Sequence, residues 1–317
     1  MFDNLKIIFF GLGSIGSRHL KLIKKNYNLK ISAYRSDKSS IPFDGIHNYY
    51  NIEEALNKHY DVAFITNPTH LHVKTSLLCI KASIKNLFIE KPISHNLDKV
   101  EKLKNELERN NCSAYIAYNM RFNPIIKKLK DYVNNESNNP FFAETRCCSF
   151  LPMWRPKKDY RKIYSAKAEE GGGVLLDLSH EFDYNEYLFG KILKIDGIYS
   201  KMSSLDINTE DFCNVNIRFK EGIKGLIYLD YFSRIKERWI KIHFQNKEIF
   251  ADFISKYIKI SDQREVKKIN FNFDRDAVYK AQLDFYFKNF RKNPTKTNNF
   301  NASLRLFKKI IEFKISN

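Results

Sequence analysis

The sequence lacks any long hydrophobic run. None of the apolar stretches in the 317 residues approaches the ~20 residues that a membrane-spanning helix needs. The apolar run Ile7–Phe10 near the start is also too short for the core of a secretory signal peptide. These absences argue against a membrane protein, and cytoplasmic residence is the expectation.

Cysteine is scarce, and its spacing carries no motif. The five cysteines are Cys79, Cys112, Cys147, Cys148 and Cys213. Their number is odd, and no CxxC or Cys/His metal spacing is present. Adjacent residues of a strand point to opposite faces, so Cys147 and Cys148 are not expected to act together. We therefore predict five reduced thiols.

Patterns typical of nucleic-acid binding are missing, although the chain is basic. Lys and Arg number 54 against 36 Asp and Glu, which gives a formal net charge of +18. The lysines are spread along the whole chain, and no helix-turn-helix, RNA-binding or zinc-finger pattern accompanies them. The sequence therefore predicts no nucleic-acid partner, although a basic balance favours an anionic small substrate.

Apolar material is ample, and the chain is long enough for two domains. The hydrophobic fraction of 43% supports a core, and the length exceeds what one core usually supports. Strand and helix patterns alternate over the first 120 residues. Strands are predicted over Lys6–Phe10, Lys30–Tyr34, Asp61–Ile65, Leu87–Glu90 and Ala114–Tyr118, and helices over Ser14–Lys25, Leu71–Ala82 and Asn96–Asn110. This alternation predicts an α/β domain with a doubly wound parallel sheet.

The second half has the pattern of an α+β domain with a large, mostly antiparallel sheet. Its short, aromatic, often alternating runs are Phe141–Phe150, Lys194–Tyr199, Phe212–Phe219, Ile223–Tyr231, Trp239–Phe244, Glu248–Phe253 and Tyr257–Ile260. One helix is predicted over Val174–Phe189, and the tail is predicted helical over Ala277–Phe290 and Ala302–Phe313. With a boundary near Tyr118–Pro124, the predicted domains are residues 1–120 and 121–317, with the option that the terminal helix packs back on the first domain.

A glycine motif follows the first predicted strand. Gly11, Gly13 and Gly16 form GxGxxG, and Ser14 and Ile15 begin the first predicted helix between them. In this pattern the first glycine permits a tight turn, the second lets the backbone approach a pyrophosphate, and the third lets helix and strand pack closely. The helix N-terminus then faces the phosphates with unpaired N–H groups. The strand–turn–helix context predicts a dinucleotide site.

The end of the second predicted strand bears on the choice of dinucleotide. An NAD site usually has Asp or Glu there, whereas this chain has Arg35 followed by Ser36. An arginine would pair with a 2′-phosphate, and the serine could add a hydroxyl donor, so NADP is predicted over NAD. Two alternatives stay open at this point: an exposed strand-end arginine, and the acid Asp37 as a late ribose ligand.

Five motifs together carry a family resemblance. They are Gly11–Gly16 with His19, Thr66–Thr69 with His72, Glu90–Pro92, Tyr118–Pro124, and Gly171–Gly173 with Asp177, His180 and Asp183. Their order and spacing resemble the glucose–fructose oxidoreductase / inositol dehydrogenase (Gfo/Idh/MocA) family. Within it, the stretches Phe150–Pro156 and Leu176–Glu181 look like the branch found among bacterial surface-sugar pathways.

The resemblance implies a Rossmann domain, an antiparallel sheet domain, and an active site in the cleft between them. It also implies a bound nicotinamide cofactor, a sugar-like substrate, and a homodimer or homotetramer. Lys91 matches the family's catalytic lysine, and the bond before Pro92 is often cis in relatives, which would aim Lys91 at the ligand. The remaining cofactor contacts implied are Thr66, Asn67, Pro68, His72 and Glu90.

The helix after the glycine triplet supplies the predicted base. Asp177, His180 and Asp183 are three apart, so they share one face of a helix, while Leu175 and Phe182 share another. A histidine in a polar stripe suits a general base, although a solvated face with an incidental histidine is the alternative. Many relatives separate the aspartate from the histidine by four positions rather than three. We therefore assign His180 first, and Asp177 orients His180, contacts the substrate, or caps the helix.

A basic, aromatic segment precedes the glycine triplet. The basic, aromatic segment around Trp154 and Arg155 can stack on a sugar ring and grip a phosphate or carboxylate, or it is a solvated loop. The predicted substrate-contacting residues are Lys91, Asn119, Arg121, Trp154, Arg155, Asp177 and His180. No metal is predicted, because Glu181 points off the shared helix face and no second histidine cluster completes a site.

The activity predicted from all this is an NAD(P)-dependent oxidation or reduction. We expect a hydride to pass between C4 of the nicotinamide and a carbinol carbon of a sugar, sugar phosphate or sugar nucleotide. The resemblance to the surface-sugar branch implies a role in surface-glycan precursor synthesis. The resemblance leaves two alternatives open. Some relatives keep the cofactor bound and use transient oxidation to cleave glycosides, and others are non-catalytic NADP-binding sensors, which have no need of Lys91 and His180.

Overall fold

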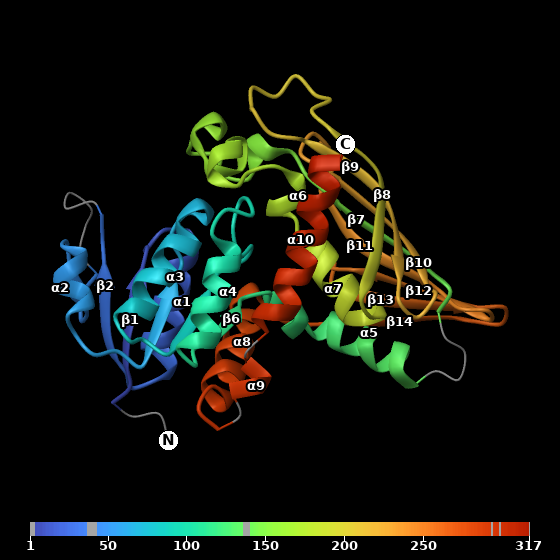
Figure 1. The fold of residues 1–317 in the computed structure, drawn as a ribbon. Coiled ribbons are helices and arrows are strands. Elements are labelled where there is room, and N and C mark those ends of the chain that lie inside the picture. Colours follow the sequence, from blue (N-terminus) through green and yellow to red (C-terminus); the bar gives the residue numbers. More distant parts are fainter. Residues whose placement is uncertain (1–3, 37–42, 136–139, 293, 298, 317) are drawn as a thin grey trace. The chain divides into compact units, whose positions relative to one another are not determined.

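The chain folds into two compact units. The computed structural model describes residues 4–36, 43–135, 140–292, 294–297 and 299–316 (Figure 1). The first unit consists of residues 1–118 and 275–305, and the second of residues 119–274 and 306–317. The predicted linear division at residue 120 differs from this at the C-terminal end, because residues 275–305 return to the first unit.

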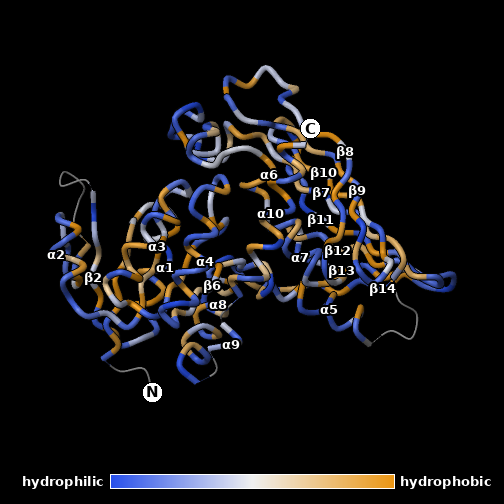
Figure 2. The backbone as a smooth tube through the Cα atoms, viewed as in Figure 1, coloured by the Kyte–Doolittle hydropathy of each residue, from blue (hydrophilic) through white to orange (hydrophobic). Residues whose placement is uncertain are grey.

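A parallel sheet forms the centre of the first unit. Its strands have the order β3-β2-β1-β4-β5-β6, and every neighbouring pair is parallel. They are β1 (Lys6–Phe10), β2 (Lys30–Tyr34), β3 (His47–Tyr49), β4 (Val62–Ile65), β5 (Asn86–Ile89) and β6 (Ser113–Ile116). Figure 2 shows hydrophobic residues around β1, and β1 and β4 are buried apolar strands, as expected for a sheet covered on both faces. The predicted Rossmann topology is confirmed.

Helices cover this sheet. They are α1 (Ser14–Asn26), α2 (Ile52–Leu56), the 3₁₀ turn η1 (Thr69–Leu71), α3 (His72–Lys81), α4 (Val100–Arg109), α8 (Arg275–Asn289) and α9 (Pro294–Thr297). Helix α8 packs against α1 through an ion pair of Arg18 with Asp276 and a hydrogen bond of 2.6 Å from Tyr27 to Asp284. Tyr286 on α8 packs edge-on against Phe88 of β5. These contacts explain why a C-terminal segment belongs to the first unit.

A larger sheet forms the second unit. Its strands have the order β14-β13-β12-β11-β7-β10-β9-β8, and only β7 and β10 pair in parallel among the described residues. They are β7 (Phe142–Cys148), β8 (Ile192–Ser200), β9 (Phe212–Phe219), β10 (Lys224–Asp230), β11 (Glu237–His243), β12 (Lys247–Asp252), β13 (Tyr257–Asp262) and β14 (Val266–Asn270). The prediction of a mostly antiparallel second sheet is confirmed.

Among the residues that the structure describes, the helices of the second unit lie on one face of this sheet (Figure 1). They are α5 (Pro124–Asn135), α6 (Val174–Asp177), α7 (His180–Phe189) and the second part of α10 (Phe300–Ser316). On β7, Ala143, Thr145 and Cys147 are buried, whereas Glu144 and Arg146 on the other side are half-buried. All five cysteines are buried free thiols, which confirms the prediction of reduced cysteines.

Short 3₁₀ turns complete the second unit. They are η2 (Asn119–Phe122), η3 (Leu151–Met153), η4 (Tyr160–Lys162), η5 (Tyr164–Ala166) and η6 (Ala168–Glu170). In the part of the chain that the structure describes, no helix has the length and apolar character needed to cross a membrane.

Candidate active site

The glycine loop is shaped by close packing at two positions and by open space at a third. Gly11 has φ +93°, and a Cβ there would come within 2.6 Å of the Cα of Asn67. A Cβ on Gly16 would overlap the carbonyl oxygen of Gly11 and come within 2.6 Å of the Thr66 hydroxyl oxygen. A Cβ on Gly13 would meet no described atom within 4 Å. Gly11 and Gly16 therefore serve the fold, and Gly13 leaves space for a ligand.

The N-terminus of α1 is uncapped and points its N–H groups at that space. Gly13 occupies the N-cap position with no side chain to accept from the first turn, and the first turn contains no acidic residue. Unpaired N–H groups and the positive end of the helix dipole suit a phosphate. The residues present therefore fit the pyrophosphate of a dinucleotide. When bound, such a cofactor supplies a nicotinamide ring that accepts or donates a hydride.

These two glycines make a matched pair for experiment. We expect Gly13→Ala to leave the free energy of unfolding within about 0.5 kcal/mol of wild type. It should weaken dinucleotide binding about tenfold or more, because the methyl group occupies the ligand space. Gly16→Ala should instead destabilise the chain by about 1–3 kcal/mol through overpacking. Thermal melts and titration of reduced-cofactor fluorescence test both. Normal cofactor affinity in Gly13→Ala would exclude the glycine loop as the phosphate site.

The loop after β4 packs on the glycine loop. The Thr66 hydroxyl donates to the carbonyl oxygen of Gly11 at 2.5 Å. The Asn67 amide nitrogen donates to the Thr75 hydroxyl at 2.8 Å, and its Oδ1 is buried without a hydrogen-bond partner among the described residues. Thr66, Asn67 and Pro68 thus lie at the carboxyl edge of the sheet, where ligands of doubly wound folds bind.

The turn after β5 carries Lys91 to the same edge of the sheet. Glu90 is buried and accepts from the His19 ring at 2.7 Å. The Lys91–Pro92 bond is cis, as the family resemblance implies, and Lys91 is half-buried. β5 lies beside β4, which lies beside β1 in the parallel sheet. The predicted catalytic lysine and the glycine loop therefore share one edge of one sheet.

Arg35 lies at the end of β2, as predicted. Its backbone N–H donates to the carbonyl oxygen of Tyr49 at 2.9 Å, and its guanidinium lies 5.9 Å from the centre of the Phe43 ring. Ser36 is exposed. The competing acid Asp37 lies outside the described residues.

The predicted helix over Val174–Phe189 is wrong in one respect: it is broken. Helix α6 ends at Asp177, and α7 begins at His180 after Leu178 and Ser179. The glycine triplet explains the local path. Gly173 has φ +96° and packs against the Glu210 carboxylate, while Gly172 packs against the carbonyl oxygens of the Tyr164–Ser165 segment. The shared-face argument does not hold across the break.

Asp177 is the centre of a hydroxyl cluster. Its carboxylate accepts from the Tyr164 hydroxyl at 2.5 Å, from the Ser165 hydroxyl at 2.6 Å and from the Tyr231 hydroxyl at 3.2 Å. Burial raises the pKa of Tyr164 and of Tyr231, and the Asp177 charge raises them further, so both phenols remain donors. No sequence pattern pointed to Tyr164, Ser165 or Tyr231. Asp177 therefore anchors the segment before the glycine triplet, whatever else it contacts.

Two ion pairs with buried carboxylates hold the first turn of α7, directly after His180. Glu181 accepts from the Arg238 guanidinium at 2.7 Å, and both oxygens of Asp183 accept from Arg121, at 2.9 and 2.7 Å. Burial raises the pKa of Asp183, and the Arg121 charge opposes that. Asp183 is fully buried, so it does not belong to an exposed polar stripe, and His180 itself is half-buried. The predicted substrate contact of Arg121 stays a prediction.

Trp154 and Arg155 lie around the Asp177 cluster. The Trp154 ring nitrogen donates to the Ser149 hydroxyl at 2.8 Å, and its ring meets the Tyr231 ring edge-on at 5.2 Å. The charge of half-buried Arg155 acts on Tyr164. Asn119 is buried in η2, the same short turn that carries Arg121. The structure thus places Trp154, Arg155 and Asp177 together in the second unit.

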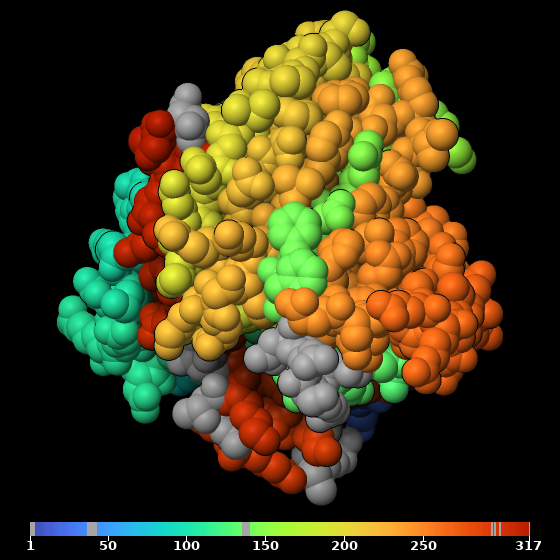
Figure 3. All heavy atoms as spheres, turned by 90° about the vertical axis from the view of Figure 1, so that its right-hand side faces the viewer, coloured from blue at the N-terminus to red at the C-terminus, as the bar shows by residue number. Residues whose placement is uncertain are grey.

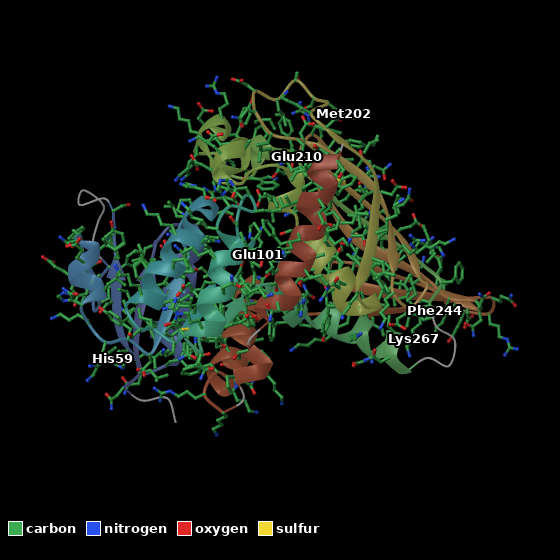
Figure 4. The ribbon with its side chains drawn as sticks, in the orientation of Figure 1. His59, Glu101, Met202, Glu210, Phe244 and Lys267 are labelled. Carbon is green, nitrogen blue, oxygen red and sulfur yellow. The ribbon has the colours of Figure 1, made fainter. Side chains whose placement is uncertain are left out.

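Glu210 connects the start of α6 to the C-terminal helix α10. Figure 4 labels Glu210 in the second unit. Its carboxylate accepts from the Leu175 backbone at 3.4 Å and from the Lys314 ammonium at 2.8 Å. Sequence reasoning did not single out either residue.

As for a metal, the described residues contain no group of three or more His, Cys, Asp or Glu side chains that could hold one.

Comparison with family models decides the family. Residues 5–118 match an oxidoreductase family model with an NAD-binding Rossmann fold. Residues 144–249 match the C-terminal domain model of the same family. The chain belongs to the GFO/IDH/MocA family. This GFO/IDH/MocA oxidoreductase thus combines an NAD-binding Rossmann unit with the family's second domain.

Individual relatives of this GFO/IDH/MocA chain are distant. It is 28% identical over 239 residues to the myo-inositol 2-dehydrogenase of Thermotoga maritima, covering 70% of this chain and 67% of that one. The chain spans about two thirds of the length of the curated relatives that it matches.

Two solved structures show the same fold over nearly the whole chain. A levoglucosan dehydrogenase with NADH has a TM-score of 0.83 at 15% identity, covering 98% of this chain and 96% of the other. The WlbA dehydrogenase of Chromobacterium violaceum, with NADH and UDP-GlcNAcA, has a TM-score of 0.79 at 16% identity, covering 99% and 93%.

Proposed function

We propose that this chain is an NAD(P)-dependent oxidoreductase that moves a hydride between nicotinamide and a carbinol carbon of a sugar, sugar phosphate or sugar nucleotide. The observation that carries the proposal is the first unit's sheet edge, which brings an uncapped helix N-terminus, an open Gly13 and the Lys91 turn together. The solved relatives that bind levoglucosan or UDP-GlcNAcA with NADH support a carbohydrate substrate. Surface-glycan precursor synthesis is the biological role that we infer.

The chain's own residues would divide the chemistry as follows. His180 takes or gives the hydroxyl proton, since imidazole is the side chain suited to proton transfer near neutral pH. Lys91 donates to the substrate oxygen and stabilises its developing negative charge. Trp154 offers a ring face to the sugar, and Arg155 a guanidinium to an anionic group. Asp177 holds the segment that follows them through Tyr164 and Ser165.

The proposal is tested by identifying what the purified protein binds and turns over. Mass spectrometry of co-purified small molecules comes first, followed by absorbance of the reduced cofactor with sugars, sugar phosphates and sugar nucleotides. We expect stoichiometric reduction of the cofactor by one of these classes. Product formation without net cofactor turnover would indicate glycoside cleavage instead. Cofactor binding without any reaction across the panel would favour a sensor and contradict the proposal.

We also propose that NADP binds more tightly than NAD. Arg35 stands at the strand end where an acid would repel a 2′-phosphate. Arg35→Asp should reverse the preference, with a loss of about 10- to 100-fold in NADP affinity, as expected for a charge-assisted hydrogen bond. Fluorescence titration of both reduced cofactors measures this. Equal affinities in the wild type, or tighter NAD, would remove Arg35 from this role.

A homodimer or homotetramer is part of the proposal. Figure 3 looks onto the helix-free face of the second unit's sheet. Half-buried aromatic residues on this face, Tyr228, Trp239 and Phe250, alternate with charged ones. Such a mixed, aromatic surface is typical of a protein interface. Light scattering of the purified chain gives the mass in solution, and a monomer would contradict this point.

A further inference from the structure

Two buried histidines hold the turn that carries Lys91. On one side of Lys91, Glu90 accepts from the His19 ring of α1 at 2.7 Å. On the other side, Pro92 offers its carbonyl oxygen to the Nδ1 of His72 at 2.8 Å. Both rings are almost wholly buried, with exposed fractions of 0% for His19 and 2% for His72. Both residues that flank Lys91 are therefore held by a histidine, Glu90 through its side chain and Pro92 through its carbonyl oxygen.

His72 also contacts the loop that packs on the glycine loop. Its Nε2 lies 2.9 Å from the carbonyl oxygen of Asn67. The Asn67 backbone is in turn the part that Gly11 packs against, since a Cβ on Gly11 would reach its Cα within 2.6 Å. One imidazole thus bridges the Lys91 turn and the loop that supports the candidate phosphate site.

Both ring nitrogens of His72 face carbonyl oxygens, which are acceptors. A carbonyl oxygen only accepts, and a neutral imidazole carries one N–H, so the neutral ring can donate to Pro92 or to Asn67 but not to both. His19 differs: its Nδ1 has no hydrogen-bond partner among the described residues, so one proton on Nε2 satisfies it. For His72, burial lowers the pKa, while both carbonyl contacts and the Glu90 charge oppose that and His70 adds to it.

We propose that His72 is a positioning residue that couples the candidate cofactor loop at Asn67 to the turn that carries Lys91. Nδ1 faces the carbonyl oxygen of Pro92 beside Lys91, and Nε2 faces the carbonyl oxygen of Asn67. A proton on either nitrogen ties the ring to that loop, and a ring with both protons donates to both loops at once. The proposal rests on the proposed function only in calling one side catalytic and the other cofactor-binding. The mechanical coupling itself rests on the two contacts and on the burial of the ring.

Two variants separate the contacts. The amide nitrogen of Asn occupies the place of Nδ1, and that of Gln the place of Nε2. His72→Asn should keep the tie to Pro92, and His72→Gln the tie to Asn67. We expect His72→Gln to lower kcat on the order of 10- to 100-fold, since small misplacements of a catalytic group cost that much, with near-normal cofactor affinity. His72→Asn should weaken cofactor binding about tenfold, the effect of one hydrogen bond, with a smaller loss in kcat.

Hydrogen exchange provides a readout that needs no activity. Followed by mass spectrometry, exchange should increase in residues 90–95 for His72→Gln and in residues 66–70 for His72→Asn. His72→Leu should increase exchange in both, and its thermal melt shows whether the chain still folds. The Asn and Gln variants keep the test valid even if the Leu variant unfolds. Equal exchange patterns in the Asn and Gln variants, or patterns like wild type, would overturn the proposal.

A double variant separates this proposal from the proposed function. If His72 acts on turnover through Lys91, then His72→Gln in the Lys91→Ala background should cause no further loss in kcat. Full additivity would overturn the turnover part. If Lys91→Ala proves fully active, the catalytic role of Lys91 fails. The exchange pattern then still decides whether His72 couples the two loops.

Discussion

Lys91→Ala is expected to lower turnover about 10²–10³-fold, the cost of removing one preorganised donor to a developing oxyanion. The fold and the cofactor affinity should remain close to wild type, because the residues on either side of Lys91, Glu90 and Pro92, are each hydrogen-bonded to a buried histidine. Lys91 is half-buried at the carboxyl edge of the parallel sheet. Single-turnover reduction of the cofactor with a true substrate measures the effect.

A lysine on the surface of the same unit serves as the control for this substitution. Lys81 is exposed at the end of α3, so Lys81→Ala removes the same charge without touching the sheet edge. We expect its turnover to equal that of the wild type. Normal turnover in Lys91→Ala would remove the lysine from the chemistry. A parallel fall in cofactor affinity and turnover would indicate binding rather than transition-state stabilisation.

Much of the parallel sheet was predictable, because a strand buried on both faces has an uninterrupted apolar run in the sequence. The uninterrupted apolar runs of β1 and β4 are fully buried, and each was predicted to within a residue. The edge strands β3 and β14 were missed. β3 has the sequence His-Asn-Tyr, and β14 is mostly exposed and contains two lysines. Their pairing comes from neighbouring strands and not from a hydrophobic pattern, so sequence periodicity does not reveal it.

The candidate site was predictable where its signal is local. The glycine motif, the Lys91 turn and the Arg35 position lie in short segments whose order in the chain reveals them. The partners of Asp177 were not predictable, because the Tyr231 hydroxyl comes from 54 residues away and the Ser165 hydroxyl from a different turn. The break between α6 and α7 was also missed, since no proline or glycine lies between Asp177 and His180 to mark it. Packing of the glycine triplet on Glu210 and Ser165 sets that path instead.

His180 and Asp177 are expected to respond differently to substitution. His180→Ala should lower the rate of hydride transfer about 10²–10⁴-fold, the usual contribution of a general acid or base. The fold should persist, because the pairs Glu181–Arg238 and Asp183–Arg121 hold the first turn of α7. Single-turnover cofactor reduction measures the rate, and thermal melts check the fold.

Asp177→Asn should act through structure more than through chemistry. One carboxylate oxygen becomes a donor that faces a hydroxyl, which weakens the cluster with Tyr164, Ser165 and Tyr231. We expect a loss of about 1–3 kcal/mol in the free energy of unfolding, the cost of a hydrogen bond to a charged group, and only a moderate fall in rate. Tyr164→Phe is the matched control, because it removes one donor from the same carboxylate and leaves the charge intact.

The comparison of these three variants assigns the base. If His180→Ala is nearly inactive while Asp177→Asn and Tyr164→Phe lose stability together and keep most of the rate, then His180 moves the proton and Asp177 anchors the segment before the glycine triplet. If Asp177→Asn is inactive at normal stability while His180→Ala retains near-normal rates, the aspartate is the base and the histidine a substrate contact. Normal rates in both would place the α6–α7 junction outside the chemistry. The catalytic roles that the family resemblance implies for Asp177 and His180 would then be wrong, whereas the inference of a dinucleotide site at the glycine loop would still stand.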